Sequence, residues 1–250
     1  MIQEGGKRVE STLAIKQATE FKKGIQSGIS IAIGYMPIAL TFGLIAKTTG
    51  LALSETVMMS LLVFAGAAQY ISLSLLMQGI GIFEIVLTTL IVNIRHFLMS
   101  ASLNEKAEED SIAARMGYSF GITDETFSVA ATRDGKVNAG YMFGLILISY
   151  SSWVINSGLG FLIGAGLPQT LQESMSVALY AMFVGLLVPS MKNNVKVVYL
   201  AVLAASFNSI FTLAELMSTG WAIVSATLLA AVIVEVVETF KNGGGAQADE

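Results

Sequence analysis

The most regular feature of this sequence is a series of long apolar runs separated by short polar stretches. About 20 apolar residues are enough to cross a bilayer as a helix. The runs that lack Asp, Glu, Lys and Arg are residues 24–46, 56–83, 137–172, 174–191, 197–214 and 216–234. A further run, 82–103, contains Arg95 and His96 but is apolar on both sides of them. The pattern predicts an all-α fold, a polytopic transmembrane helix bundle with seven full spans.

Residues 117–132 form a shorter eighth candidate, which we treat as one short polar segment. It is only moderately apolar and carries Asp124 and Glu125 at its centre. If it crosses, the chain has eight spans and both termini lie inside; if it does not, seven spans place the N-terminus outside. The basic residues of the loops favour a cytoplasmic C-terminus in both cases. The side of the N-terminus therefore depends on this one segment.

Composition supports a membrane location and excludes several other classes of protein. The 250 residues are 54% hydrophobic and only 13% charged, with a net charge of -4, whereas soluble domains contain about 25% charged residues. We therefore expect the lipid bilayer as a partner and no nucleic acid. Cysteine is absent, which excludes thiolate metal sites and cysteine nucleophiles. The sequence contains no HExxH, GxSxG or GxxxxGK[ST] motif, so no catalytic residue, metal or cofactor is predicted.

The chain divides into three parts by composition. Residues 1–23 alternate basic and acidic side chains and form an N-terminal polar, amphipathic segment; 24–240 form the transmembrane domain; and 241–250 are expected to be a disordered tail. Residues 42–55 resemble 160–173, which suggests an internal repeat. Secondary transporters often contain such repeats, inverted when each half contains an odd number of crossings.

Glycine and proline in the spans predict close packing and one irregular helix. Small-xxx-small pairs allow helix backbones to approach closely, and they occur at Gly24/Gly28, Gly117/Gly121, Gly140/Gly144 and Gly160/Gly164. Gly34 and Pro37 lie at the middle of the first span. Proline has no backbone N–H and frees a carbonyl one turn earlier. Two interpretations stay open, a simple kink or a broken helix whose freed backbone binds substrate.

Several polar residues lie inside the predicted spans. Gln69 follows the small-residue run 65–68 and could form a helix-to-helix hydrogen bond or contact a ligand. Arg95 is the most unusual, because a charge at membrane depth is costly and normally has a partner in the bundle interior. Asp124 and Glu125 are natural partners; alternatively, the guanidinium binds the carboxylate of a small substrate.

Two neighbours of Arg95 complete the candidate pathway for a substrate or ion. His96 is the single histidine of the chain. It titrates near neutrality when unperturbed, so it could carry a coupling proton or act only as a hydrogen-bonding group. Asn93 precedes it by three residues. The candidate pathway residues are Gly34, Pro37, Gln69, Asn93, Arg95, His96, Asp124 and Glu125.

Four clusters in this order resemble the AzlC family of bacterial branched-chain amino acid permeases. They are Gly34-Tyr35-Met36-Pro37 with Phe42-Gly43, then Phe64-Ala65-Gly66-Ala67-Ala68-Gln69, then Asn93-Ile94-Arg95-His96, and finally Thr123-Asp124-Glu125. The resemblance spans about residues 24–240, and the order and spacing of the clusters are those of the family.

The resemblance implies a function and a location. Members resemble the large subunit of a two-component exporter of branched-chain amino acids, and in some cases methionine. Their partner is a small membrane protein of the AzlD family, and an ion gradient rather than ATP drives export. This implies a multi-pass protein of the bacterial cell (inner) membrane with an amino-acid substrate.

Two alternatives stay open at this point. The first is the membrane subunit of an ATP-driven transporter, a label that the family sometimes receives. Its coupling loop would need a Glu-Ala-Ala motif, and the nearest stretch, 112–117, has the wrong spacing. The second is a channel-like permease for another small solute, because pores and carriers share polar residues that face a cavity.

Overall fold

The structure is a computed structural model of the 250-residue chain. It describes residues 2–163 and 194–245, with side chains for 17–163 and 194–239, and isolated positions between 163 and 194. The described residues form helices and no strand, which confirms the all-α prediction for them. The predicted span 174–191 and most of the second repeat segment lie outside the described residues.

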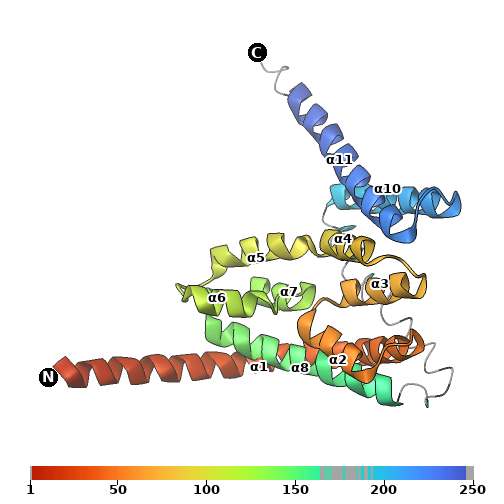
Figure 1. Cartoon of the computed structure of the whole chain (residues 1–250). Helices are drawn as coiled ribbons and strands as arrows, with labels where there is room; N and C mark the ends of the chain where they lie inside the picture. The colour runs from red at the N-terminus through yellow and green to blue at the C-terminus, as the bar shows by residue number, and fades with distance from the viewer. Residues whose placement is uncertain are drawn as a thin grey trace. The chain divides into compact units, whose positions relative to one another are not determined.

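The chain folds into helices of very different lengths (Figure 1). They are α1 (Ile2–Thr48), α2 (Leu53–Leu62), α3 (Gly66–Met77), α4 (Ile82–Asn93), α5 (Arg95–Lys106), α6 (Ile112–Ser119), α7 (Asp124–Thr132), α8 (Ala139–Ile163), α10 (Val195–Leu213) and α11 (Thr219–Gly245). Among the described residues, five stretches are long and apolar enough to cross a membrane: Gln17–Thr48, Ile82–Lys106, Ala139–Ile163, Val195–Leu213 and Thr219–Thr239. The predicted seven full spans are therefore not all present as single helices.

Two compact units make up the chain, and each is described by itself. The first contains Met1–Tyr70 and Asn93–Ser176, and the second contains Ile71–Val92 and Val177–Glu250. The polar residues that the sequence singles out all lie in the first unit. Its fold therefore decides which of them meet.

Helices α1 and α8 pack against each other along the first unit and run parallel. A Cβ atom built on Gly144 would lie 2.1 Å from the carbonyl oxygen of Phe21, and one on Gly160 would lie 2.0 Å from that of Leu40. Residue numbers rise together along both helices, so the two helices point the same way (Figure 1). Glycine at these positions lets the backbones touch, as the small-xxx-small pattern predicted.

Helix α2 runs back along α8 and then reverses. Val57 contacts Gly158, whereas four residues later the carbonyl of Leu61 accepts a hydrogen bond from Tyr150 at 2.7 Å. Residue numbers therefore rise along α2 as they fall along α8. The helix ends after Leu62, and residues 63–65 have no helical structure.

The first turn of α3 leads back toward the end of α1. The ring centre of Phe64 lies 6.0 Å from that of Tyr35, and Tyr70 donates a hydrogen bond to the carbonyl of Ile38 at 2.7 Å. Helices α2 and α3 therefore form a hairpin, and the expectation of one crossing over 56–83 is wrong. The reason is physical: a charge-free run indicates an apolar environment, but it does not indicate where the chain turns.

Helices α6 and α7 form a second hairpin from the opposite end of α1 and α8. Along α6, Gly117 packs against Phe143, and beyond its end Gly121 packs against Ile146, so α6 follows the direction of α8. Helix α7 returns along α1, and the ends of the hairpin come together where the amide of Glu108 donates to the carbonyl of Val137 at 2.7 Å. Segment 117–132 therefore enters and leaves at one end and does not cross as a single helix.

The directions of the long helices restrict the number of crossings. Arg95 at the start of α5 pairs with Asp124, and Lys106 at its end donates to the carbonyl of Ala131, so α5 follows α7 and opposes α1. Because α8 is parallel to α1, an odd number of crossings must separate them. One crossing through Ile82–Lys106 satisfies this condition when both hairpins return.

The same parallel course bears on the suggested repeat. The C-terminal ends of α1 and α8 carry the matched segments 42–45 and 160–163, and these run in the same direction. The rest of the second segment lies outside the described residues, so the repeat stays a prediction.

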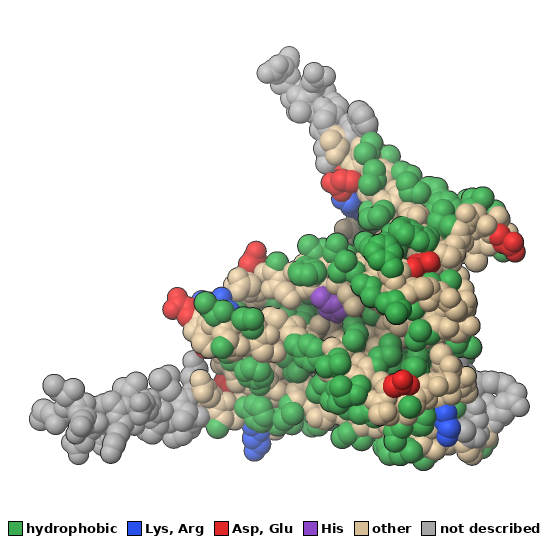
Figure 2. All heavy atoms as spheres, viewed as in Figure 1, with side chains coloured by type: hydrophobic (Ala, Val, Ile, Leu, Met, Phe, Trp, Pro, Cys, Tyr) green, Lys and Arg blue, Asp and Glu red, His purple; other side chains and the backbone are tan. Residues whose placement is uncertain are grey.

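The second unit is held by polar contacts at helix ends. The Glu84 carboxylate accepts hydrogen bonds from the Ser218 hydroxyl and from the backbone N–H of Trp221 at 3.1 Å, which satisfies free donors at the start of α11. Lys196 on α10 pairs with Glu235 on α11 at 2.8 Å. Helix α10 has no buried residue, and hydrophobic side chains cover large parts of the visible surface (Figure 2), as a lipid environment requires.

Candidate functional site

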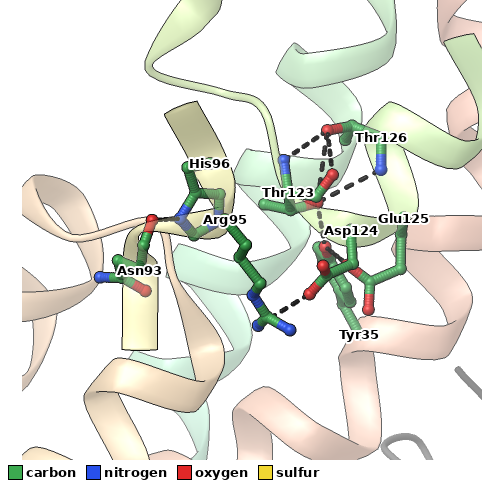
Figure 3. Close-up of polar contacts among 8 residues, drawn as sticks. All are labelled: Tyr35, Asn93, Arg95, His96, Thr123, Asp124, Glu125 and Thr126. Carbon is green, nitrogen blue, oxygen red and sulfur yellow. Dashed lines mark hydrogen bonds and ion pairs between the residues drawn. The ribbon is translucent and has the colours of Figure 1, made fainter. Parts of the chain in front are cut away.

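Tyr35, near the middle of the span Gln17–Thr48 on α1, contacts the tips of both hairpins. The first tip is residues 63–65, and the second is residues 120–125. Its ring lies edge-on to Phe64 from the first tip, with 6.0 Å between the ring centres. Its hydroxyl lies 2.7 Å from that of Thr123 and donates to a carboxylate oxygen of Glu125 at 2.6 Å, both from the second tip. The side chain is only 4% exposed. The polar groups of the second tip therefore meet Tyr35 inside the bundle (Figure 3).

The start of α7 places two acidic side chains at the second tip. The hydroxyl of Thr123 accepts from the backbone N–H of Thr126 at 3.2 Å, and that of Thr126 accepts from the N–H of Thr123 at 2.7 Å. This reciprocal cap begins the helix. It puts Asp124 and Glu125 in the first turn, where the positive end of the helix dipole stabilises negative charge.

The predicted ion pair of Arg95 is present, through one nitrogen. Its Nη2 lies 2.9 Å from a carboxylate oxygen of Asp124, and the two side chains are 39% and 23% exposed. The Nε atom of Arg95 is buried and has no hydrogen-bond partner in the described part of the chain. The pair therefore leaves donor capacity on the guanidinium, next to a site that is accessible from outside the protein.

His96 and Asn93 lie beside this pair without bonding to it. The Nδ1 atom of His96 is 3.1 Å from the carbonyl oxygen of Asn93, one turn earlier. In Figure 3 the Arg95 side chain extends toward Asp124, whereas that of Asn93 points away from it. The side-chain oxygen of Asn93 is buried and has no partner among the described residues.

Gln69 is fully buried, and its amide is satisfied by the protein. It donates to the carbonyl of Met59 at 3.0 Å and accepts from the indole N–H of Trp153 at 2.8 Å. These bonds tie the start of α3 to the end of α2 and to α8. The geometry favours the helix-to-helix interpretation of this residue.

Gly34 and Pro37 are exposed and do not join the cluster around Tyr35. Helix α1 continues through both positions and is not broken there. A Cβ atom built on Gly34 would meet nothing within 4 Å. The hydroxyl of Thr41 donates to the carbonyl of Pro37 at 2.8 Å, within the same helix.

Sequence reasoning missed the residues that fasten the second hairpin. Tyr35 and Thr123 were seen only as parts of clusters, although Thr123 and Thr126 have the spacing of a helix cap. Glu20 on α1 pairs with Arg133 beyond the end of α7 at 2.6 Å. These two lie 113 positions apart, and no local pattern indicates such a long-range pair.

The class of protein follows from three features of the fold. These are the span-length helices, the two hairpins and the charged pair at a hairpin tip. Interrupted helices and ionisable groups near the middle of the membrane are features of membrane transport proteins. The sequence model of the AzlC protein family matches residues 30–167, and this chain belongs to that family. The match contains all eight candidate residues.

Curated relatives agree with this family. An uncharacterized membrane protein of Archaeoglobus fulgidus is 31% identical over 72% of this chain and 80% of its own length. The inner membrane protein YgaZ of Escherichia coli is 29% identical over 70% and 74%. The branched-chain amino acid transport protein AzlC of Bacillus subtilis is 24% identical over 58% of each chain. No solved structure matches this chain.

Proposed function

We propose that this chain is the large subunit of a secondary transporter that exports branched-chain amino acids, namely Leu, Ile and Val, with Met as a further substrate. A small membrane protein of the AzlD family is its partner, and an ion gradient drives export across the bacterial cell membrane. Family membership and the name of the Bacillus subtilis relative support the substrate class. The observation that carries the mechanism is the Arg95–Asp124 pair at the second hairpin tip.

The pair suits a zwitterionic substrate. Arg95 uses only one nitrogen on Asp124, and its Nε has no partner. A substrate carboxylate can therefore bind the guanidinium, which recognises carboxylates bidentately. Asp124, released from Arg95, then faces the ammonium group of the same molecule. The opposite charges of an amino acid thus replace an internal ion pair without leaving a buried charge unpaired.

Apolar surface at the second hairpin tip suits an aliphatic side chain. Phe120 at the same tip is 48% exposed, and its ring lies 5.9 Å from that of Tyr150 on α8. A branched aliphatic chain gains about 25 cal/mol for each Å² of apolar surface that it buries. Preference for Leu, Ile, Val and Met over polar amino acids follows from such a surface.

The positive-inside rule supports an orientation for the first unit. One end of the first unit contains the point where α1 enters the bundle and the base of the second hairpin. The basic side chains at this end are Lys22, Lys23, Lys106, Arg115, Arg133 and Lys136. At the other end of α1 lies Lys47. Cytoplasmic loops carry the excess of Lys and Arg. The α6–α7 hairpin therefore opens toward the cytoplasm, and the C-terminus is also assigned there.

An efflux experiment tests the proposal. Cells without their own exporters are loaded with a leucine-containing dipeptide, and external leucine is followed with this chain alone, with its small partner, and with a protonophore. We expect efflux that depends on the partner and collapses with the protonophore. Efflux that persists without a gradient and does not saturate indicates a channel-like permease, and no efflux with both chains in the membrane contradicts the substrate.

A further inference from the structure

We propose that Glu125, rather than Asp124 or His96, holds the coupling proton, and that the Tyr35 hydroxyl connects it to the second hairpin tip. The inference rests on the proposed function, because it concerns how an ion gradient drives the same site. Glu125, Asp124 and His96 are all ionisable and lie close to Arg95, but their bonding partners differ.

Asp124 is compensated by a full positive charge. Its carboxylate lies 2.9 Å from Nη2 of Arg95. Protonation of Asp124 would leave the guanidinium without a counter-charge inside the membrane, and breaking a partly buried ion pair in this way is costly. Arg95 therefore needs Asp124 as its counter-charge while no substrate is bound.

Glu125 has a neutral partner instead. The Tyr35 hydroxyl lies 2.6 Å from its carboxylate oxygen. A hydroxyl can both donate and accept a hydrogen bond, so this contact survives whether or not Glu125 carries a proton. Addition of a proton leaves no charge unpaired. Glu125 is also only half-buried, so water can reach it from the tip.

A chain of hydroxyls continues from Tyr35 into the tip. The Tyr35 oxygen lies 2.7 Å from that of Thr123, which lies 3.3 Å from that of Thr126. With Glu125 ionised, Thr123 donates to Tyr35 and Tyr35 donates to Glu125. With Glu125 protonated, the order reverses: Glu125 donates to Tyr35, and Tyr35 donates to Thr123. The proton on Glu125 therefore sets the hydrogen bonds that hold the tip on α1.

The charge of the tip supplies the coupling. The tip contains one positive charge, on Arg95, and up to two negative charges, on Asp124 and Glu125. Its net charge is therefore −1 when Glu125 is ionised and zero when Glu125 is protonated. Occluding a net charge in an apolar environment is costly, so the protonated tip without substrate is the form suited to the return step of export. Proton entry thereby accompanies the return step.

Glu125 is surrounded by other ionisable groups. They are Tyr35 from α1, Asp124 beside it on α7, and Arg95 and His96 from α5. His96 interacts with the two carboxylates only through space, because its ring bonds to the backbone carbonyl of Asn93. Its ring therefore has no bonded path to the tip.

The test uses proteoliposomes that contain this chain and its small partner. Leucine exchange is measured without a pH gradient, and proton flux is measured with an internal pH dye during leucine movement. We expect Glu125→Gln to lower the ratio of protons to leucine by about tenfold or more, because an amide does not take up a proton in this range. Tyr35→Phe lowers the same ratio, and Glu125→Asp retains a measurable part of it. The matched control is Glu105→Gln, which removes an exposed carboxylate from α5.

Each outcome has a defined meaning. A wild-type ratio in Glu125→Gln overturns the inference, and so does a His96→Gln variant that loses proton flux while leucine exchange continues. Glu125→Gln that loses exchange and proton flux together, while its amount in the membrane is normal, also overturns it, because the residue then serves substrate binding. Wild-type protein without any leucine exchange overturns the proposed function itself, and the inference falls with it.

Discussion

The hydroxyl of Tyr35 on α1 donates a 2.6 Å hydrogen bond to the carboxylate of Glu125 on α7, 90 positions away in the chain. This bond joins the middle of a membrane-spanning helix to the tip of a hairpin that turns back inside the bundle. An ionisable group at such a place must be satisfied by protein, because lipid offers no hydrogen-bonding partner. The contact therefore fastens the hairpin tip to this helix.

Removal of the Tyr35 hydroxyl should loosen the tip. Tyr35→Phe keeps the ring against Phe64 but leaves the Glu125 carboxylate without this donor. Loss of a hydrogen bond to a buried or charged group costs about 1–3 kcal/mol. We expect a lower apparent Tm of the detergent-solubilised protein. Tyr199→Phe on α10, where the side chain is 57% exposed, is the control and should leave Tm unchanged.

Arg95 should be required for transport. Arg95→Ala removes the only guanidinium at the tip and leaves Asp124 unpaired, so leucine efflux should be abolished. Arg95→Lys keeps the charge but loses the planar fork that fits a carboxylate, so it should retain little. Full efflux in Arg95→Ala, at normal amounts in the membrane, would contradict a role in substrate binding.

The close approach of α1 and α8 predicts which glycines tolerate a methyl group. Gly144→Ala would place Cβ 2.1 Å from the backbone oxygen of Phe21, so the helices must separate and the folded protein should be lost or strongly destabilised. Gly34→Ala is the matched control, because nothing lies within 4 Å of its Cβ position. Thermal unfolding in detergent measures both. If Gly34→Ala folds normally but does not transport, Gly34 belongs to the substrate pathway after all.

Gln69 should act on stability. Gln69→Ala leaves the buried indole N–H of Trp153 and the carbonyl of Met59 without these partners, which costs about 1–3 kcal/mol for each unsatisfied group. We expect a lower Tm together with a change in tryptophan fluorescence, since Trp153 is one of only two tryptophans. Transport at wild-type stability that changes only in substrate preference would instead assign Gln69 to the pathway.

The second hairpin predicts an unambiguous labelling pattern. The chain has no cysteine, so single cysteines can be introduced without background. Glu109→Cys and Asp134→Cys lie at the base of the hairpin in exposed positions and should react with an impermeant thiol reagent from the same, cytoplasmic side. Thr48→Cys, at the end of α1, should react from the other side. Labelling of positions 109 and 134 from opposite sides would mean that 117–132 crosses the membrane.

Local signals predicted much of the candidate site. The cost of a charge in the membrane indicated Arg95 and its partner Asp124, and the pair is present. The glycine pairs indicated helix packing that α1 and α8 confirm. By contrast, Pro37 suggested a broken helix that is absent, because one missing N–H does not interrupt a long helix packed against α8. Gln69 could be read in two ways until Trp153, 84 positions away, was seen to bond to it.

The sequence by itself determined that this chain is an all-helical membrane protein, which family it belongs to, and which residue types are too costly in lipid to be there without a role. These follow from the transfer free energies of side chains, which are local properties. Only the tertiary structure decided that 53–77 and 112–132 turn back as hairpins and that Tyr35 meets Glu125. A charge-free run has the same transfer free energy whether it crosses or reverses. The direction of each helix therefore depends on which neighbour its glycines and hydroxyls contact.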